Sequence, residues 1–145
     1  RRLIRALNYY KENNESINNN KTDRLLYDAL FIGLTTDRNN LYDKINKRVD
    51  IMVKDGLLEE IKPYYDKNIR TKPLLNAIGY REIYKYFDGE YTLDEAIDKI
   101  KQNSRHYAKR QYTFFNHQLP VVWFETDYNN FNNTIEKVSN YIDSN

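Results

Sequence analysis

The 145-residue sequence contains no cysteine, which excludes a disulfide framework and any metal site built on thiolates. This absence fits a reducing compartment, and we expect a cytoplasmic protein. No apolar run approaches the roughly 18 residues that a membrane-spanning helix needs, so we expect no membrane partner. The N-terminal residues also lack the apolar segment of a signal peptide.

The motifs of several enzyme classes are absent as well. The two histidines, His106 and His117, lack the HExxH spacing of zinc proteases, and we expect no metal site in this chain. No Ser/His/Asp arrangement can be recognised. No glycine-rich phosphate loop of the GxxxxGK[ST] type occurs. Any chemistry of this sequence must therefore depend on other residues.

Helical periodicity dominates the remaining pattern. It predicts helices over residues 1–11, 36–55, 57–65, 74–87, 92–117 and 131–142, with a polar loop over residues 12–23. Thr92 and Glu95 have the spacing of a capping box at the start of the longest helix. Gly79 lies inside a helical pattern, where glycine costs roughly 1 kcal/mol relative to alanine. It marks the true helix start, a kink or a close approach of another backbone.

Two short apolar segments, residues 29–34 and 121–124, are candidate strands. Strands that are apolar on both faces are typical of a buried, largely parallel sheet. Two strands cannot form such a sheet beside this much helix. The chain also begins with Arg1 and not with Met. We therefore expect a piece of a longer protein that contains the remaining strands.

The net charge of +2 is too small for a polycation, so the distribution of charge matters more than its sum. No acidic residue occurs between Asp98 and Glu125. Five basic residues fall in that window: Lys99, Lys101, Arg105, Lys109 and Arg110. On a helix, Lys101, Arg105, Lys109 and Asn116 share one face. Such a local basic stretch indicates a surface for an anion or a nucleic acid.

Basic and aromatic residues alternate in the segment that runs from Lys109 through Arg110, Gln111, Tyr112, Thr113, Phe114 and Phe115 to Asn116. Basic side chains can neutralise phosphates, while rings and amides can contact bases. The competing interpretation is a solvated basic face with the three aromatic side chains in the core. The pattern alone does not exclude it.

Arg48 lies on the edge of an apolar helical stripe formed by Leu41, Ile45 and Met52, whereas Asp50 points away. A charge at such an edge must be paired or face a cleft. One interpretation is an arginine that extends to solvent or pairs with a carboxylate. The other is a guanidinium that binds two phosphate oxygens through its fork of donors.

Six ordered segments together resemble one family over nearly the whole chain: RRLIRAL (1–7), FIGLT followed by RVD (31–50), GLLEEI (56–61), AIGYREI (77–83), AKRQ with TFF (108–115) and VVWF (121–124). The resemblance is to the C-terminal portion of bacterial tRNA dimethylallyltransferases, also called tRNA isopentenyltransferases. It implies an α/β fold with a P-loop-kinase-like core and a helical insertion. Residues 1–28 would end the insertion, and residues 29–145 would complete the core.

The resemblance also implies a reaction. Such a transferase moves the dimethylallyl group of dimethylallyl diphosphate to N6 of the adenosine 3′ of the tRNA anticodon, with Mg²⁺ as cofactor of the full enzyme. We expect the anticodon stem-loop as partner and a monomer. The phosphate loop and the general-base aspartate would lie in the missing part, so this chain alone is expected to be inactive. The alternative is a non-catalytic helical RNA-binding module.

Site residues follow from the resemblance position by position. Arg48 matches the arginine that contacts the donor's diphosphate. The residues that match tRNA-contacting positions are Arg1, Arg2, Leu3, Ile4, Arg5, Asn76, Ala77, Ile78, Gly79, Tyr80, Arg81, Lys109, Arg110, Gln111, Tyr112, Thr113, Phe114, Phe115 and Asn116. At Phe114 the family usually has tryptophan, and at Asn116 often a basic residue.

Overall fold

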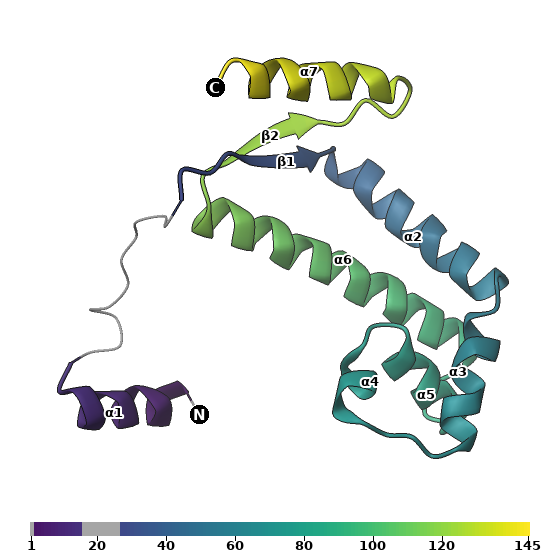
Figure 1. Ribbon diagram of the computed structural model, residues 1–145. Coiled ribbons are helices and arrows are strands. Elements are labelled where there is room, and N and C mark those ends of the chain that lie inside the picture. The colour runs from purple at the N-terminus through teal and green to yellow at the C-terminus, as the bar shows by residue number, and fades with distance from the viewer. Residues whose placement is uncertain (1, 16–26) are drawn as a thin grey trace. The chain divides into compact units, whose positions relative to one another are not determined.

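The computed structural model describes residues 2–15 and 27–145, which divide into two compact units, Arg1–Leu30 and Phe31–Asn145. The first unit contains helix α1 (Arg2–Asn13), two residues longer at its C-terminal end than predicted. The remainder of the predicted polar loop lies largely outside the described residues. The second unit contains, in order, β1 (Phe31–Thr35), α2 (Arg38–Lys54), α3 (Leu57–Asp66), α4 (Lys72–Asn76), α5 (Tyr80–Phe87), α6 (Leu93–Gln118), β2 (Val121–Glu125) and α7 (Phe131–Asp143) (Figure 1).

The two strands pair in parallel, which confirms the predicted parallel sheet. Phe31 lies opposite Val121, and Thr35 lies opposite Glu125. Within this unit, α7 covers one side of the strands, and α2 and α6 lie on the other (Figure 1). The prediction that both strands are fully buried is wrong for the described chain, since Leu34 is 50% exposed and its neighbours are only partly buried.

The core of the second unit lies where α2, α3, α5 and α6 meet, away from the sheet. Its buried apolar residues are Val49, Leu57, Ile61, Ile83, Tyr84, Ala96 and Ile100. The predicted capping box at the start of α6 is confirmed. The Glu95 amide donates to Thr92 Oγ1 over 3.2 Å, and the Thr92 amide donates to Glu95 Oε2 over 2.8 Å. This box fixes the end of α6 that packs in the core.

The single helix predicted over residues 74–87 is wrong, because the chain leaves the helical conformation between α4 and α5. Gly79 has φ 100° and ψ −62°, which no L-residue adopts without strain, and α5 begins directly after it. Gly79 therefore marks a true helix start. No heavy atom lies within 4 Å of the position that a Cβ on Gly79 would take. Backbone conformation alone thus favours glycine here.

Candidate functional site

Arg48 lies on α2 with an exposed side chain, at the rim of a hollow of about 490 Å³ between α2 and α6. The lining residues are Leu41, Ile45, Arg48, Val49, Met52, Ile78, Ile100, Ser104, Tyr107, Ala108 and Gln111. Arg48 makes no hydrogen bond or ion pair with any other residue that the structure describes. This geometry contradicts pairing of Arg48 with a carboxylate of the described residues, and its role toward a phosphate stays a prediction.

The basic residues of α6 do not all have the same surroundings, and two of them contact α2. Lys101 Nζ lies 2.6 Å from Asp50 Oδ1, and Arg105 Nη1 donates to Asn46 Oδ1 over 2.6 Å. Both contacts join α6 to α2, and the Asp50 carboxylate that Lys101 reaches is itself exposed, as expected for a residue outside the apolar stripe. The sequence pattern missed these contacts because the partners are far apart along the chain. Lys101 and Arg105 hold the two helices together.

A second hollow brings together two of the segments that resemble tRNA-contacting ones. It is lined by Asn76, Ala77, Ile78, Arg81, Asn103, Tyr107 and Arg110. Four of these residues lie at the end of α4, in the connection or in the first turn of α5: Asn76, Ala77, Ile78 and Arg81. The other three, Asn103, Tyr107 and Arg110, lie on α6. Ile78 and Tyr107 line both this hollow and the one beside Arg48, so the two hollows adjoin. Arg48 thus borders one of two neighbouring hollows, and Arg81 and Arg110 border the other.

Glu82 lies behind this second hollow and was not singled out by the sequence. Its side chain is buried, with 2% exposure. Its Oε1 accepts from Arg81 Nε over 2.9 Å, from Arg81 Nη2 over 2.6 Å and from Asn103 Nδ2 over 2.8 Å. Its Oε2 accepts from the Gly79 amide over 2.9 Å. The only sequence signal is an acidic residue three positions after a glycine, the spacing of a helix start.

Tyr80 points toward α3, away from the residues that line the second hollow. Its hydroxyl donates to Glu60 Oε1 over 2.5 Å, and its ring contacts the edge of the Tyr64 ring. The hydrogen bond to the Glu60 carboxylate, together with partial burial, raises the pKa of Tyr80 to about 12. The hydroxyl of Tyr80 is therefore engaged within the protein and stays protonated at neutral pH.

Tyr80→Phe is expected to lower the free energy of unfolding by about 1 kcal/mol and to leave RNA affinity unchanged. Because the folded-state pKa is raised, the bond contributes fully below about pH 10, and its contribution is lost as pH rises through about 12. Urea unfolding at neutral and strongly alkaline pH measures this, with Tyr64→Phe as the matched control. Weaker RNA binding by Tyr80→Phe would instead place its hydroxyl against RNA.

The C-terminal part of α6 packs against the sheet. Trp123 Nε1 donates to Asn116 Oδ1 over 2.7 Å, and the Trp123 and Tyr112 ring centroids lie 5.0 Å apart. Thr113 Oγ1 donates to the Lys109 carbonyl within the helix over 2.9 Å. Phe114 is 57% exposed, so the interpretation that places it in the core is wrong for the described chain. Tyr112 and Asn116 have partners here, and their role toward RNA stays a prediction.

Helix α1 carries the remaining candidate residues in the first unit. Leu3 and Ile4 are 73% and 63% exposed, and Ile4 and Arg5 border a shallow groove on this helix. Arg2 begins the helix, whereas Arg1 lies outside the described residues. Leu3, Ile4 and Arg5 are thus exposed within this unit, and their role toward RNA stays a prediction.

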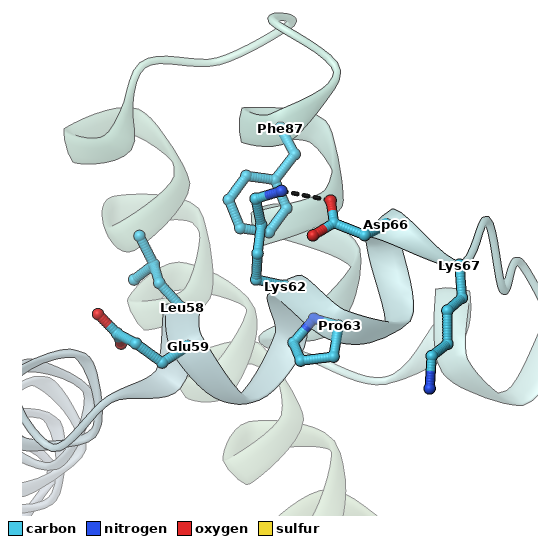
Figure 2. Close-up of a pocket in the computed structure, with 7 residues that line it drawn as sticks. All are labelled: Leu58, Glu59, Lys62, Pro63, Asp66, Lys67 and Phe87. Carbon is cyan, nitrogen blue, oxygen red and sulfur yellow. Dashed lines mark hydrogen bonds and ion pairs between the residues drawn. The ribbon is translucent and has the colours of Figure 1, made fainter.

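A further hollow lies on the outer side of α3 and α5 and contains none of the candidate residues. Figure 2 shows Lys62 in front of the Phe87 ring and paired with Asp66, with Leu58 and Pro63 beside them. The Lys62 ammonium lies 5.7 Å from the centre of the Phe87 ring. The charge of Lys62 is compensated by Asp66, whereas Lys67, which also lines this hollow, has no side-chain partner among the described residues.

The described residues contain neither a membrane-spanning helix nor a metal-binding cluster. None of the helices there is long and apolar enough to cross a membrane. No group of three or more histidine and acidic side chains is arranged to hold a metal ion in residues 2–15 and 27–145. The two neighbouring hollows bordered by Arg48 and by Arg81 and Arg110 thus remain the candidate site.

Comparison with known proteins defines the class to which this fold and site belong. The profile of the family described as "IPP transferase" matches residues 1–118. The chain is 47% identical over 146 residues to the tRNA dimethylallyltransferase of Geobacillus kaustophilus strain HTA426, which covers 98% of this chain and 46% of that protein. It is 48% identical over 128 residues to the enzyme of the same name from Bacillus subtilis strain 168. That alignment covers 86% of this chain and 41% of the Bacillus subtilis protein.

Solved structures agree with these relatives. The full-length tRNA isopentenylpyrophosphate transferase of Bacillus halodurans superposes with a TM-score of 0.77 at 44% identity, covering 99% of this chain and 44% of that one. The tRNA delta(2)-isopentenylpyrophosphate transferase of Staphylococcus epidermidis gives a TM-score of 0.76 at 32% identity, covering 99% and 48%. The chain therefore belongs to the IPP transferase family, which confirms the resemblance seen in the sequence. It spans about half the length of the curated relatives it matches.

Proposed function

We propose that the complete protein is a tRNA dimethylallyltransferase and that this chain corresponds to its C-terminal portion. It transfers the dimethylallyl group of dimethylallyl diphosphate to N6 of the adenosine 3′ of the anticodon. The observation that carries this proposal is the pair of neighbouring hollows in a chain of this family, one bordered by Arg48 and the other by Arg81 and Arg110.

Arg48 binds the diphosphate of the donor in this proposal. A planar guanidinium can contact two phosphate oxygens at once and remains charged at every physiological pH. The hollow beside it is lined largely by aliphatic side chains, among them Leu41, Ile45 and Met52. An apolar floor with one unpaired cation at its rim suits a ligand that joins a hydrocarbon group to an anionic head.

The RNA-binding surface comprises three segments in this proposal. The first is Arg1 to Arg5 of α1, the second is Asn76 to Arg81, and the third is Lys109 to Asn116. Support comes from the second hollow, where Arg81 of the second segment and Arg110 of the third line the same depression. Phosphate contacts of this kind position an RNA, while rings and amides contact its unpaired bases.

The architecture of the complete protein belongs to the same proposal. Residues 1–28 end a helical insertion, and residues 29–145 complete an α/β, P-loop-kinase-like core. The phosphate loop and general-base aspartate lie outside this chain, which is inactive alone. Mg²⁺ assists the reaction of the complete protein. The described residues offer no cluster of three ligands for it, so we assign it no step through this chain. The complete protein acts as a cytoplasmic monomer.

Binding of an anticodon stem-loop RNA by the complete protein is expected to weaken steeply as salt rises. The slope of log affinity against log salt falls by roughly 0.7–0.9 for each phosphate-binding cation removed. Lys109→Gln and Arg110→Gln are each expected to reduce the slope by about that amount. Lys101→Gln is the matched control, because Lys101 is paired with Asp50. Fluorescence anisotropy at several salt concentrations measures the slopes.

Prenyl transfer to the same RNA, with dimethylallyl diphosphate and MgCl₂, tests the activity itself. Appearance of dimethylallyladenosine at the position 3′ of the anticodon supports the transferase. Salt-dependent RNA binding without any transfer by the complete protein would contradict it and favour the non-catalytic RNA-binding module.

A further inference from the structure

Glu82 uses its two oxygens for different purposes. Oε2 accepts from the Gly79 amide over 2.9 Å, which satisfies a free N–H at the start of α5. One oxygen is enough for that purpose. Oε1 accepts from Arg81 and Asn103, whose side chains are not needed for the start of the helix. The buried carboxylate therefore fixes two side chains that line the second hollow.

The chemistry of a carboxylate determines how these two side chains are oriented. An ionised carboxylate can only accept hydrogen bonds, so Asn103 must present its amino group to Glu82. Asn103 Oδ1 is then left as an acceptor at the hollow. Arg81 contacts Glu82 through Nε and Nη2, which leaves Nη1 as a donor on the other side of the guanidinium.

The rest of the hollow complements this donor and acceptor. Tyr107 is 50% exposed, and its ring lies 5.8 Å from the Arg110 guanidinium carbon. An exposed ring offers a stacking surface to a base, and Arg110 adds a cation for a phosphate. A ring, a cation, an oriented donor and an oriented acceptor together match one unpaired nucleotide. The acceptor requires a donor on that nucleotide, either a base amino group or the ribose 2′-hydroxyl.

We infer that Glu82 is a positioning residue and that Asn103 is an RNA-contacting residue, which together with Arg81, Tyr107 and Arg110 hold one unpaired nucleotide of the RNA. This inference rests on the proposed function, because it takes RNA as the ligand. Glu82 touches no RNA itself. It acts by preorganising Arg81 and Asn103, so that binding RNA does not first require them to be ordered.

Two variants of the complete protein test the inference in steady-state prenyl transfer to the stem-loop RNA. Glu82→Gln keeps the volume but removes the negative charge and replaces one of the two acceptor oxygens with an NH₂ donor. Asn103→Ala removes the acceptor alone. Each is expected to raise KM for RNA about ten-fold, with kcat within about two-fold and KM for dimethylallyl diphosphate unchanged. Gln102→Ala, a neighbour on α6 outside the hollow, is the matched control.

The double variant Glu82→Gln/Asn103→Ala distinguishes a positioning role of Glu82 from a merely structural one. If Glu82 acts through Asn103, the two changes in KM are less than multiplicative when combined. A 2′-deoxy stem-loop distinguishes the two donors: loss of the Asn103→Ala effect on that RNA assigns the 2′-hydroxyl, and its persistence assigns a base amino group. If Asn103→Ala leaves the KM for RNA unchanged, the inference is overturned. This result decides the question even if Glu82→Gln does not fold.

Failure of the proposed function gives a different result. A wild-type protein that transfers no prenyl group contradicts the proposed activity, and the same variants are then compared by RNA affinity. Weaker RNA binding by Glu82→Gln and Asn103→Ala would support the inference without the activity. Equal RNA affinity for both variants and wild type would overturn it.

Discussion

Replacement of Arg48 by alanine in the complete protein is expected to lower the single-turnover rate of prenyl transfer by about 10²–10³-fold. Departure of the diphosphate concentrates negative charge on its oxygens, and a fixed cation stabilises that charge. Arg48 has an exposed side chain and no partner among the described residues, so its removal leaves no buried group unsatisfied. The melting temperature is therefore expected to change little.

Arg48→Lys is expected to restore the rate only in part. An ammonium carries the same charge but cannot offer two parallel donors to two oxygens. Lys47→Ala, at the adjacent exposed position of α2, is the matched control and should react at the wild-type rate. A folded Arg48→Ala protein with a near-normal rate would remove Arg48 from the site. A markedly lower melting temperature with a preserved rate would make it structural.

Gly33→Ala is expected to destabilise the protein by about 1–3 kcal/mol, and Gly33→Val by more. A Cβ on Gly33 would lie 2.4 Å from Trp123 Cε3 and 2.8 Å from Val121 Cγ1. Trp123 cannot move freely, because it donates to Asn116 and packs on Tyr112. Strand propensity alone would predict the opposite sign, since alanine and especially valine suit strands better than glycine. Chemical unfolding measures the difference.

Two further variants test whether a side chain at position 33 destabilises the protein by crowding Trp123 or because the strand tolerates no substitution. Leu34→Val, next to Gly33 but with an exposed side chain, should change the free energy of unfolding by less than about 0.5 kcal/mol. Trp123→Leu should remove most of the added cost of Gly33→Ala when the two are combined, because the clashing ring is gone. Additive effects of the two changes would show that the ring is not the cause.

The sequence predicted those features of the fold that depend on local patterns. The capping box at Thr92 and Glu95 located the start of α6, because both residues act on the same helical turn. The all-apolar character of the two strands predicted their parallel pairing. At Gly79 the sequence left a helix start, a kink and a close approach open, because the helical spacing of apolar residues continues across it and does not reveal the sign of a backbone angle.

The candidate site was only partly accessible from sequence. The resemblance indicated Arg48 and the segments around Arg81 and Arg110, but not that Arg81 and Arg110 line one hollow. The contact between Lys101 and Asp50 required the packing of α2 on α6, which no local pattern encodes. Glu82 was missed for the same reason, because a buried acid is recognised by its partners and not by its neighbours in the chain.

The continuity of α6 limits which changes of length the chain can tolerate. Its 26 residues form one rod of about 39 Å, anchored by the capping box at one end and by the contact of Asn116 with Trp123 at the other. One residue inserted between Ile100 and Ala108 would rotate everything beyond it by about 100°. Arg110 would then leave the hollow while Asn116 left Trp123. Insertions within this rod are therefore expected not to be tolerated.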